Sequence, residues 1–180
     1  MESFETTKNY LSGFKVAFFL LKLYFCDMSV IFLSLGTNIG DRVANLEKAH
    51  SLIEAKFKIL NKSSIYETEP WGGVAQGLFL NQVLQIETSV EPRELLKMIK
   101  NMESEMGRTE TAKWGPRVID IDILFYGDLV IDEPELIIPH KFLHERKFAL
   151  EPLNEIAPDF VHPVLKKKIS ELLSVGKRFF

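Results

Sequence analysis

The spacing of hydrophobic residues alternates along the chain between the two-residue period of a β-strand and the longer period of an α-helix. Short apolar or alternating runs predict strands at residues 30–35, 58–66, 80–87 and 118–126, followed by a turn into residues 129–131. Helical spacing predicts a helix capped by Asp41, a second from Pro92 to Gly107, and shorter helices around residues 147–154 and near Ile169. Adjoining strands interleaved with two main helices indicate an α+β fold, with helices packed on an antiparallel or mixed sheet.

The first 27 residues differ from the rest of the chain. Residues 16–26 are almost continuously apolar, but these eleven residues are fewer than the roughly 20 needed to span a bilayer. Acidic residues before this run, and the lack of a small-residue cleavage site after it, fit a signal peptide poorly. Because Met28 directly precedes the first predicted strand, we expect a domain at residues 28–180 behind an upstream extension, 1–27, that need not be translated. The less favoured alternative is an amphipathic surface helix or weak membrane anchor.

Composition narrows the function classes. The 180 residues suit one domain, with no repeat or Pro/Gly linker to divide them. A net charge of −3 means that the surface as a whole does not attract nucleic acid or anionic membrane, so any phosphate binding requires a local basic cluster. The single cysteine, Cys26, excludes an internal disulfide framework and fits a reducing cytosol.

Two acidic residues in the predicted strand 118–126 are the main candidates for chemistry. Side chains two apart on a strand share a face, so Asp120 and Asp122 should project together, about 7 Å apart at the backbone. Such a pair can hold one or two hard cations, and Mg²⁺ is typically bound by one or two carboxylates plus substrate phosphates. Nearby cationic residues that could neutralise phosphate oxygens are Arg108, Lys113 and Arg117. An Asp-x-Asp alone is more often a solvated strand face with surface ion pairs, but the preceding Trp-Gly-Pro-Arg favours the metal–polyphosphate interpretation.

At this point the chain resembles a known family. KWGPRVIDIDILFYG resembles the signature of the 6-hydroxymethyl-7,8-dihydropterin pyrophosphokinases of folate biosynthesis, and further matching segments occur in family order between about residues 30 and 162. These segments are FLSLGTNIGDR, SSIYETEPWG, FLNQV, ESEMGR and IPHKFLHERKFALEPLNEIAP. The resemblance implies a ferredoxin-like α+β sandwich and diphosphate transfer from ATP to the pterin hydroxymethyl group, with release of AMP. It also implies two Mg²⁺ ions on Asp120 and Asp122, and a clamp on the developing charge from Arg108 and Arg117. No general base is assigned.

The resemblance assigns further residues to the two substrates. For ATP it points to Glu103, Arg108, Lys113, Trp114, Arg117, Ile123, His140 and Arg146. For the pterin it points to stacking by Phe79 and Phe148, a ring-edge partner in Asn81, and pocket walls from Thr68 and Trp71. A flat heteroaromatic ring needs two apolar faces and a few amide partners at its edge, which these residue types supply. At several of these positions the alternative is a purely structural role, because a lone histidine or helix carboxylate is more often structural and most phenylalanines belong to the core.

One departure from the family concerns a loop. Glu110 stands where many members have a basic residue, which removes a potential triphosphate contact. We expect ATP to bind first, and the loops at residues 68–78 and 109–115 to close over both substrates and exclude water. The segment from Gly36 to Gly40 lacks the Gly-Lys-Ser/Thr ending of a P-loop and is interpreted as structural.

The residues themselves leave two other function classes open, namely another phosphate-transferring enzyme and a non-catalytic binding module. A nucleotidyltransferase using the same Asp pair would release pyrophosphate, and a simple kinase would release ADP. A ferredoxin-like RNA or small-ligand binding module would have no product, although the acidic net charge argues against RNA. We expect a cytoplasmic monomer whose partners are the small molecules ATP and hydroxymethyl dihydropterin, with neither nucleic acid nor membrane.

Overall fold

The computed structural model describes residues 28–71, 77–108 and 115–176. The expectations for the extension at residues 1–27, for Glu110, Lys113 and Trp114, for part of the loop at residues 68–78 and for most of the loop at residues 109–115 lie outside these ranges. The strands are β1 (Ser29–Thr37), β2 (Lys58–Lys62), β3 (Tyr66–Thr68), β4 (Phe79–Thr88), β5 (Asp120–Tyr126), β6 (Ile131–Glu133) and β7 (Leu136–Ile138). The helices are α2 (Arg42–Glu54), α3 (Pro92–Glu105), α4 (Lys147–Ile156) and α5 (Ile169–Gly176), with a 3₁₀ turn at Leu143–Glu145.

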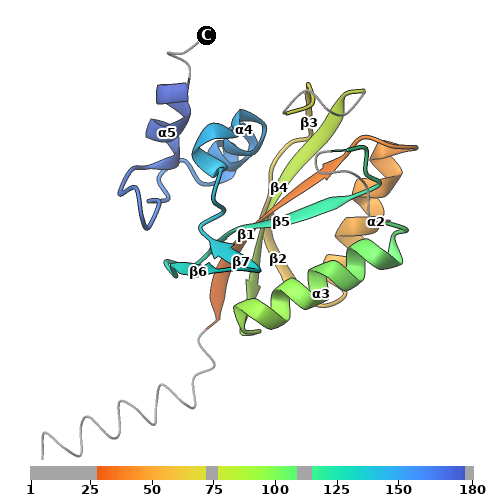
Figure 1. Ribbon diagram of the computed structural model, residues 1–180, viewed down its shortest axis with the longest axis horizontal. Helices are drawn as coiled ribbons and strands as arrows, with labels where there is room; N and C mark the ends of the chain where they lie inside the picture. The colour runs from red at the N-terminus through yellow and green to blue at the C-terminus, as the bar shows by residue number, and fades with distance from the viewer. Residues whose placement is uncertain (1–27, 72–76, 109–114, 177–180) are drawn as a thin grey trace, which may run out of the picture.

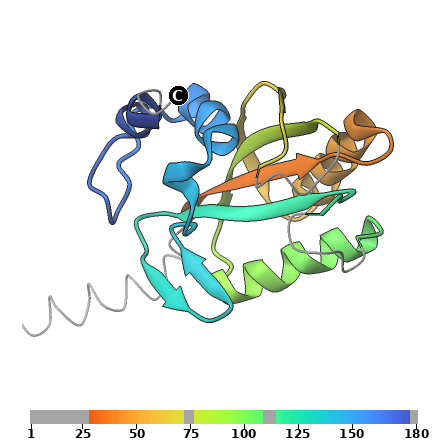
Figure 2. The same ribbon diagram turned by 45° about the horizontal axis from the view of Figure 1, so that its top comes forward.

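The main sheet is antiparallel throughout. Its strands follow the order β2-β4-β1-β5, and β3 also pairs with β4. β1 therefore lies between β4 and β5, which are far apart in sequence. β6 and β7 form a separate two-stranded hairpin, which Figure 2 shows close to one end of α3.

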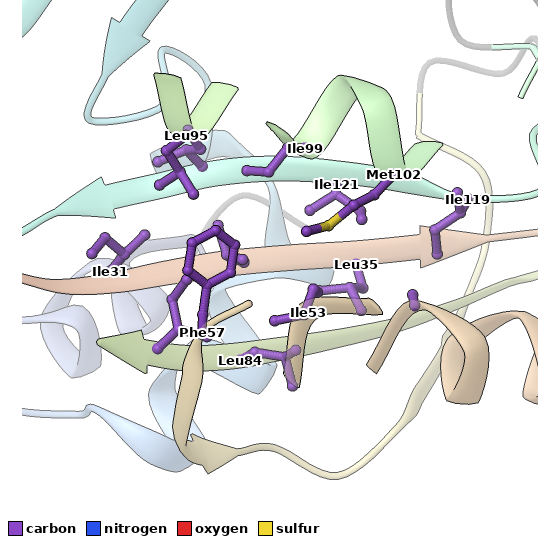
Figure 3. Packing of buried hydrophobic residues seen from close by; sticks show 14 of the residues in the cluster. Ile31, Leu35, Ile53, Phe57, Leu84, Leu95, Ile99, Met102, Ile119 and Ile121 are labelled. Atoms are coloured by element: carbon purple, nitrogen blue, oxygen red, sulfur yellow. The ribbon is translucent and has the colours of Figure 1, made fainter. Parts of the chain in front are cut away.

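Helices cover both faces of the sheet. α2 and α3 lie on one face, and α4 and α5 lie on the other (Figure 1). Figure 3 shows the first core, in which Leu95, Ile99 and Met102 of α3 point toward the strands and Ile53 of α2 reaches the same layer. The second core is built on Phe32 and Phe125 and packs against α4 and α5. The arrangement confirms the predicted α+β sandwich.

The capping signals in the sequence are present in the structure. The Asp41 side chain accepts a hydrogen bond from the Ala44 amide at 3.0 Å and so caps α2. Gly107 follows the last residues of α3 with φ of 88°, a left-handed conformation that glycine adopts without steric cost. None of the helices within the described ranges combines the length and apolar character needed to cross a bilayer.

Two expected elements differ from the observed ones. The single strand predicted at residues 58–66 is divided into β2 and β3, because the Ser63 hydroxyl accepts the Val83 amide and takes the place of a backbone partner. The segment after residue 128 forms a two-stranded hairpin, whereas the sequence predicted only its first strand. Each of its strands has three residues, too few to show a period.

Candidate active site

The two aspartates lie at the start of β5, on the sheet face opposite α2 and α3. Ile121 between them is buried in the helix-covered core, whereas the Asp120 and Asp122 side chains are 22% and 33% exposed. The predicted alternation is therefore present, and both carboxylates face the same side of the sheet.

A row of residues crosses three strands at this point. Asp120 is opposite Gly36 on β1, and Gly36 is opposite Asn81 on β4. A Cβ atom at Gly36 would lie 3.1 Å from Asn81 Oδ1 and 3.9 Å from Phe79 Cδ1. The glycine thus leaves space between the Asn81 amide and the Asp120 carboxylate. The segment from Gly36 to Gly40, which the sequence alone indicated to be structural, therefore contributes to the site.

Asp120 is held by two guanidinium groups. Arg108 Nη1 lies 2.7 Å from its Oδ1, and Arg117 Nη1 lies 2.6 Å from its Oδ2. Both arginine side chains are largely buried, at 25% and 15% exposure, so the contacts are stronger than exposed ion pairs. These interactions bring the predicted arginine clamp and one predicted metal ligand together.

Glu103 is buried beneath this cluster, with 2% of its surface exposed. It accepts hydrogen bonds from the Ile121 amide at 2.7 Å and from Lys100 Nζ at 2.8 Å, and it pairs with Arg108. Burial raises the pKa of Glu103, and the Lys100 ammonium is the leading interaction that opposes the shift. Glu103 faces the sheet, as its helix position suggested, and it fixes Arg108 and the β5 backbone from below.

Asp122 has a different environment from Asp120. Arg146 Nη1 is 3.3 Å from Asp122 Oδ2 and 3.2 Å from His140 Nε2. Burial at the base of the site, followed by repulsion from Asp120, raises the pKa of Asp122 to about 6. Burial and the neighbouring Arg146 lower the pKa of His140 to about 4, so this histidine is neutral near pH 7.

An aromatic cavity adjoins the carboxylates. Its lining includes the five residues assigned to the pterin, together with both aspartates and two arginines; these are Thr68, Trp71, Phe79, Asn81, Phe148, Asp120, Asp122, Arg117 and Arg146. The Asn81 amide donates to Thr68 Oγ1 at 2.7 Å. The Arg146 guanidinium lies over the Trp71 ring at 4.9 Å and over Phe148 at 5.7 Å, a cation–π arrangement. The cavity therefore offers aromatic walls, an amide and charged groups together.

A second cavity lies on the other side of Asp122 and Arg146, which line both. Its remaining lining comes from α3, β5, the β6–β7 hairpin and the segment after it, and includes Leu96, Lys100, Ile123, Leu136, His140, Lys141 and Phe142. Its volume is about 350 Å³, against about 80 Å³ for the aromatic cavity. Ile123 is otherwise part of the core at 6% exposure, and His144 lies in neither of the two cavities.

The sequence did not single out every residue that lines the two cavities. Ser34, Gly36 and Glu69 join the aromatic cavity, and Lys100, Lys141 and Phe142 join the second. Ser34 and Gly36 share a face of β1 by their two-residue spacing, which the sequence contains. That this face lies beside Asp120 and Asp122 follows only from the antiparallel pairing of β1 with β5.

The carboxylate pair fits a hard divalent cation. Its donors are oxygen atoms alone, and burial followed by repulsion from Asp120 raises the pKa of Asp122, so positive charge bound here would favour the ionised form. Within the described ranges, no group of three or more histidine, cysteine or acidic residues could hold a metal ion. A cation on this pair would need further oxygen ligands from substrate or water, as is usual for Mg²⁺.

Fold and site together define a class: α+β proteins in which an aromatic ring pocket adjoins paired carboxylates and arginines suited to a polyphosphate.

Comparison with known proteins supports this class. Residues 32–158 match the family model for 7,8-dihydro-6-hydroxymethylpterin-pyrophosphokinase. The 2-amino-4-hydroxy-6-hydroxymethyldihydropteridine pyrophosphokinase of Aquifex aeolicus is 47% identical over 144 residues, covering 80% of this chain and 90% of that protein. The protein of the same name from Bacillus subtilis is 43% identical over 130 residues, covering 71% of this chain and 78% of that protein.

This chain belongs to the 7,8-dihydro-6-hydroxymethylpterin-pyrophosphokinase family. Solved structures agree at the level of the fold. The crystal structure of wild-type Plasmodium falciparum HPPK-DHPS superimposes with a TM-score of 0.69 at 22% identity, covering 83% of this chain and 45% of that one. The family model and the relatives of 43–47% identity confirm the predicted family, and with it the class of enzyme, a pyrophosphokinase.

Proposed function

We propose that this chain transfers diphosphate from ATP to the hydroxymethyl group of 6-hydroxymethyl-7,8-dihydropterin, with release of AMP, in tetrahydrofolate biosynthesis. The pterin oxygen forms a bond to the β-phosphorus, the bond from the β-phosphorus to the oxygen of the α-phosphate breaks, and the hydroxyl proton is lost. The observation that carries the proposal is the sharing of Asp122 and Arg146 by the two cavities. Two different substrates bound in these cavities would meet at that point.

The aromatic cavity is the proposed pterin site. Phe79 and Phe148 would face the ring, and Asn81 would hydrogen-bond its edge, since an amide offers both a donor and an acceptor. Thr68 orients that amide through its 2.7 Å contact, which directs Asn81 Oδ1 toward the open space above Gly36. An attacking hydroxymethyl group would then lie on the side of the cavity that holds the aspartates.

The second, larger cavity is the proposed nucleotide site. Ile123 and Leu96 supply apolar walls of the kind that an adenine ring needs, and the nearby cations Lys100 and Arg146 suit phosphates. Neutral His140 would act as a hydrogen-bond partner rather than as a cation. The family resemblance adds Lys113 and Trp114, which lie outside the described residues.

The basic residues at the junction would align the phosphates. Arg108 and Arg117 already lie beside Asp120, so their guanidinium groups can neutralise charge at the transferring group with little rearrangement. Asp120 and Asp122 would hold two Mg²⁺ ions, which neutralise phosphate oxygens and make a hydroxyl group easier to deprotonate. Transfer of this kind depends mainly on alignment and charge, so no covalent intermediate is required.

The catalytic domain is proposed to span residues 28–180, as a monomer in the cytoplasm. The family match at residues 32–158 lies entirely within that range. Residues 1–27 are proposed to be an extension that the reaction does not need.

The nucleotide product tests the proposal. Protein incubated with ATP, Mg²⁺ and the reduced hydroxymethyl pterin should form AMP in a one-to-one ratio with the pterin diphosphate. D122N, which removes one carboxylate charge at constant size, should reduce kcat by roughly 10²–10³-fold, the scale of a lost electrostatic contribution. ADP as product would point to a simple kinase, and pyrophosphate would point to a nucleotidyltransferase. Full activity in the presence of excess EDTA would exclude the metal assignment.

A further inference from the structure

Arg42, the first residue of α2, contacts two residues that directly precede lining residues of the aromatic cavity, Glu67 before Thr68 and Leu78 before Phe79. Its Nη2 atom lies 2.8 Å from Glu67 Oε1, and its Nη1 donates to the Leu78 carbonyl oxygen at 2.9 Å. Glu67 lies in β3, and Leu78 directly precedes β4. One guanidinium group therefore joins the two chain segments that carry three of the proposed pterin residues, Thr68, Phe79 and Asn81.

The register shows what this contact holds in place. Thr68 is opposite Phe79, Glu67 is opposite Leu80, and Tyr66 is opposite Asn81. Successive side chains on β3 alternate, so Glu67 points to the α2 side while Thr68 points into the cavity. Arg42 acts on the strand from the side away from the ligand.

β3 depends on such side-chain contacts. It is a three-residue edge strand, paired with β4 alone. On the cavity side, Glu155 of α4 accepts hydrogen bonds from Tyr66 Oη at 2.9 Å and from the Ser64 amide at 3.0 Å. On the opposite side of the strand, Arg42 makes the corresponding contact with Glu67.

Arg42 is itself well fixed. Asp41 caps the helix that begins with it, and Asn45 Nδ2 donates to the Ile39 carbonyl oxygen at 2.8 Å, which secures the preceding turn. Its side chain is 31% exposed, and its contact with a backbone carbonyl does not depend on the Glu67 carboxylate. A contact anchored at both ends can transmit the position of α2 to β3 and β4.

We propose that Arg42 is a positioning residue for the pterin substrate. Resting on the function proposed above, it holds Thr68 and Asn81 in register and so sets affinity for the pterin, without touching either substrate. Its effect should be specific, because the second cavity is built from α3, β5 and the β6–β7 hairpin.

The test is a KM-against-kcat comparison on the full chain, with wild-type AMP formation measured first. R42M removes both contacts and should raise the KM for the pterin about tenfold, the scale of a lost charge-assisted hydrogen bond, with the KM for ATP and kcat within about twofold. R42K keeps the charge but cannot make both contacts from one rigid fork, so it should give a partial effect. E67Q, which leaves the Leu78 contact intact, should also raise the pterin KM, by a smaller factor.

The matched control is K58M. It breaks an exposed ion pair, 3.3 Å from Lys58 Nζ to Glu87 Oε2, which joins edge strand β2 to the far end of β4. The proposal is overturned if R42M leaves the pterin KM at the K58M value, or if it raises both KM values equally. If R42M does not fold, the same two comparisons are made with E67Q and R42K. For these variants too, a pterin KM at the K58M value, or an equal rise in both KM values, overturns the proposal. Absence of AMP with the wild-type protein would instead reject the proposed function.

Discussion

Asp120 and Asp122 lie two positions apart on one strand, yet they have different partners. Two guanidinium groups contact Asp120 at 2.7 Å or less, whereas Asp122 has one contact at 3.3 Å and a pKa raised to about 6. Burial is the leading cause of this raised pKa, and repulsion from Asp120 adds to it. A divalent cation bound to the pair would favour the ionised form of both carboxylates.

Gly36 provides a prediction at the residue scale. In G36A the new methyl group would lie 3.1 Å from Asn81 Oδ1, closer than ordinary van der Waals contact, so the amide must shift. The KM for the pterin should rise about tenfold, the cost of one disturbed hydrogen bond at the ring edge, while the KM for ATP stays unchanged. Steady-state kinetics with each substrate varied in turn measures both. A G36A protein with a normal pterin KM would show that the pterin does not depend on this space.

At the scale of elements, His162 fixes the connection between α4 and α5. Its Nδ1 accepts hydrogen bonds from the Val164 and Leu165 amides, both at 3.2 Å, and its ring packs edge-on against Phe125 at 5.3 Å. Burial, followed by repulsion from His144, lowers the pKa of His162, and protonation of Nδ1 would also remove the acceptor of both amides.

This predicts acid sensitivity of the fold. Because the folded pKa lies below the unfolded value of 6.5, the unfolded state takes up the proton first as the pH falls. The free energy of unfolding should then decrease below about pH 6.5, by at most about 1.4 kcal/mol per pH unit for one such group. Urea unfolding at pH 7.5, 6.5 and 5.5 measures the slope.

H162N supplies the control for this prediction. Its side-chain oxygen can accept hydrogen bonds from the same amides without titrating, so the slope should become shallower, although His50 and His140, whose pKa values burial also lowers, still contribute to it. An equal slope in wild type and H162N would contradict the assignment.

Local sequence signals were enough to predict most elements but not their pairing. The Asp41 cap, the Pro92 start and the apolar stripe of α3 are short-range features, and each occurs where the sequence indicated. The break at Ser63 depends on its contact with Val83 in a distant strand, and so no local pattern could reveal it. Element boundaries set by tertiary contacts were accordingly the ones that differed.

The whole molecule brings together residues that the sequence keeps far apart. Asn81, Gly36 and Asp120 become neighbours only through the order β4-β1-β5. The resemblance to a known family supplied these positions without the topology, apart from Gly36, whose contribution is an absent side chain. The ion-pair geometry of Arg108, Arg117 and Arg146 required the structure, because long side chains can point in many directions.

The same arrangement gives the two cavities a common wall of Asp122 and Arg146. A nucleotide in one cavity would therefore contact residues that also line the other. The two proposed substrates would therefore meet at this junction, and neither cavity alone accounts for the proposed reaction.

The most direct measurement is a crystal structure of the protein with a non-hydrolysable ATP analogue, the pterin substrate and Mn²⁺ in place of Mg²⁺. Anomalous scattering locates the metal independently of the ligand density. If Asp120 and Asp122 hold the metal, manganese peaks are expected within about 2.0–2.4 Å of their carboxylate oxygens, bridging to the phosphates, with the pterin between Phe79 and Phe148. Manganese absent from both aspartates while nucleotide and pterin are bound, or a pterin lying outside the aromatic cavity, would contradict this proposal.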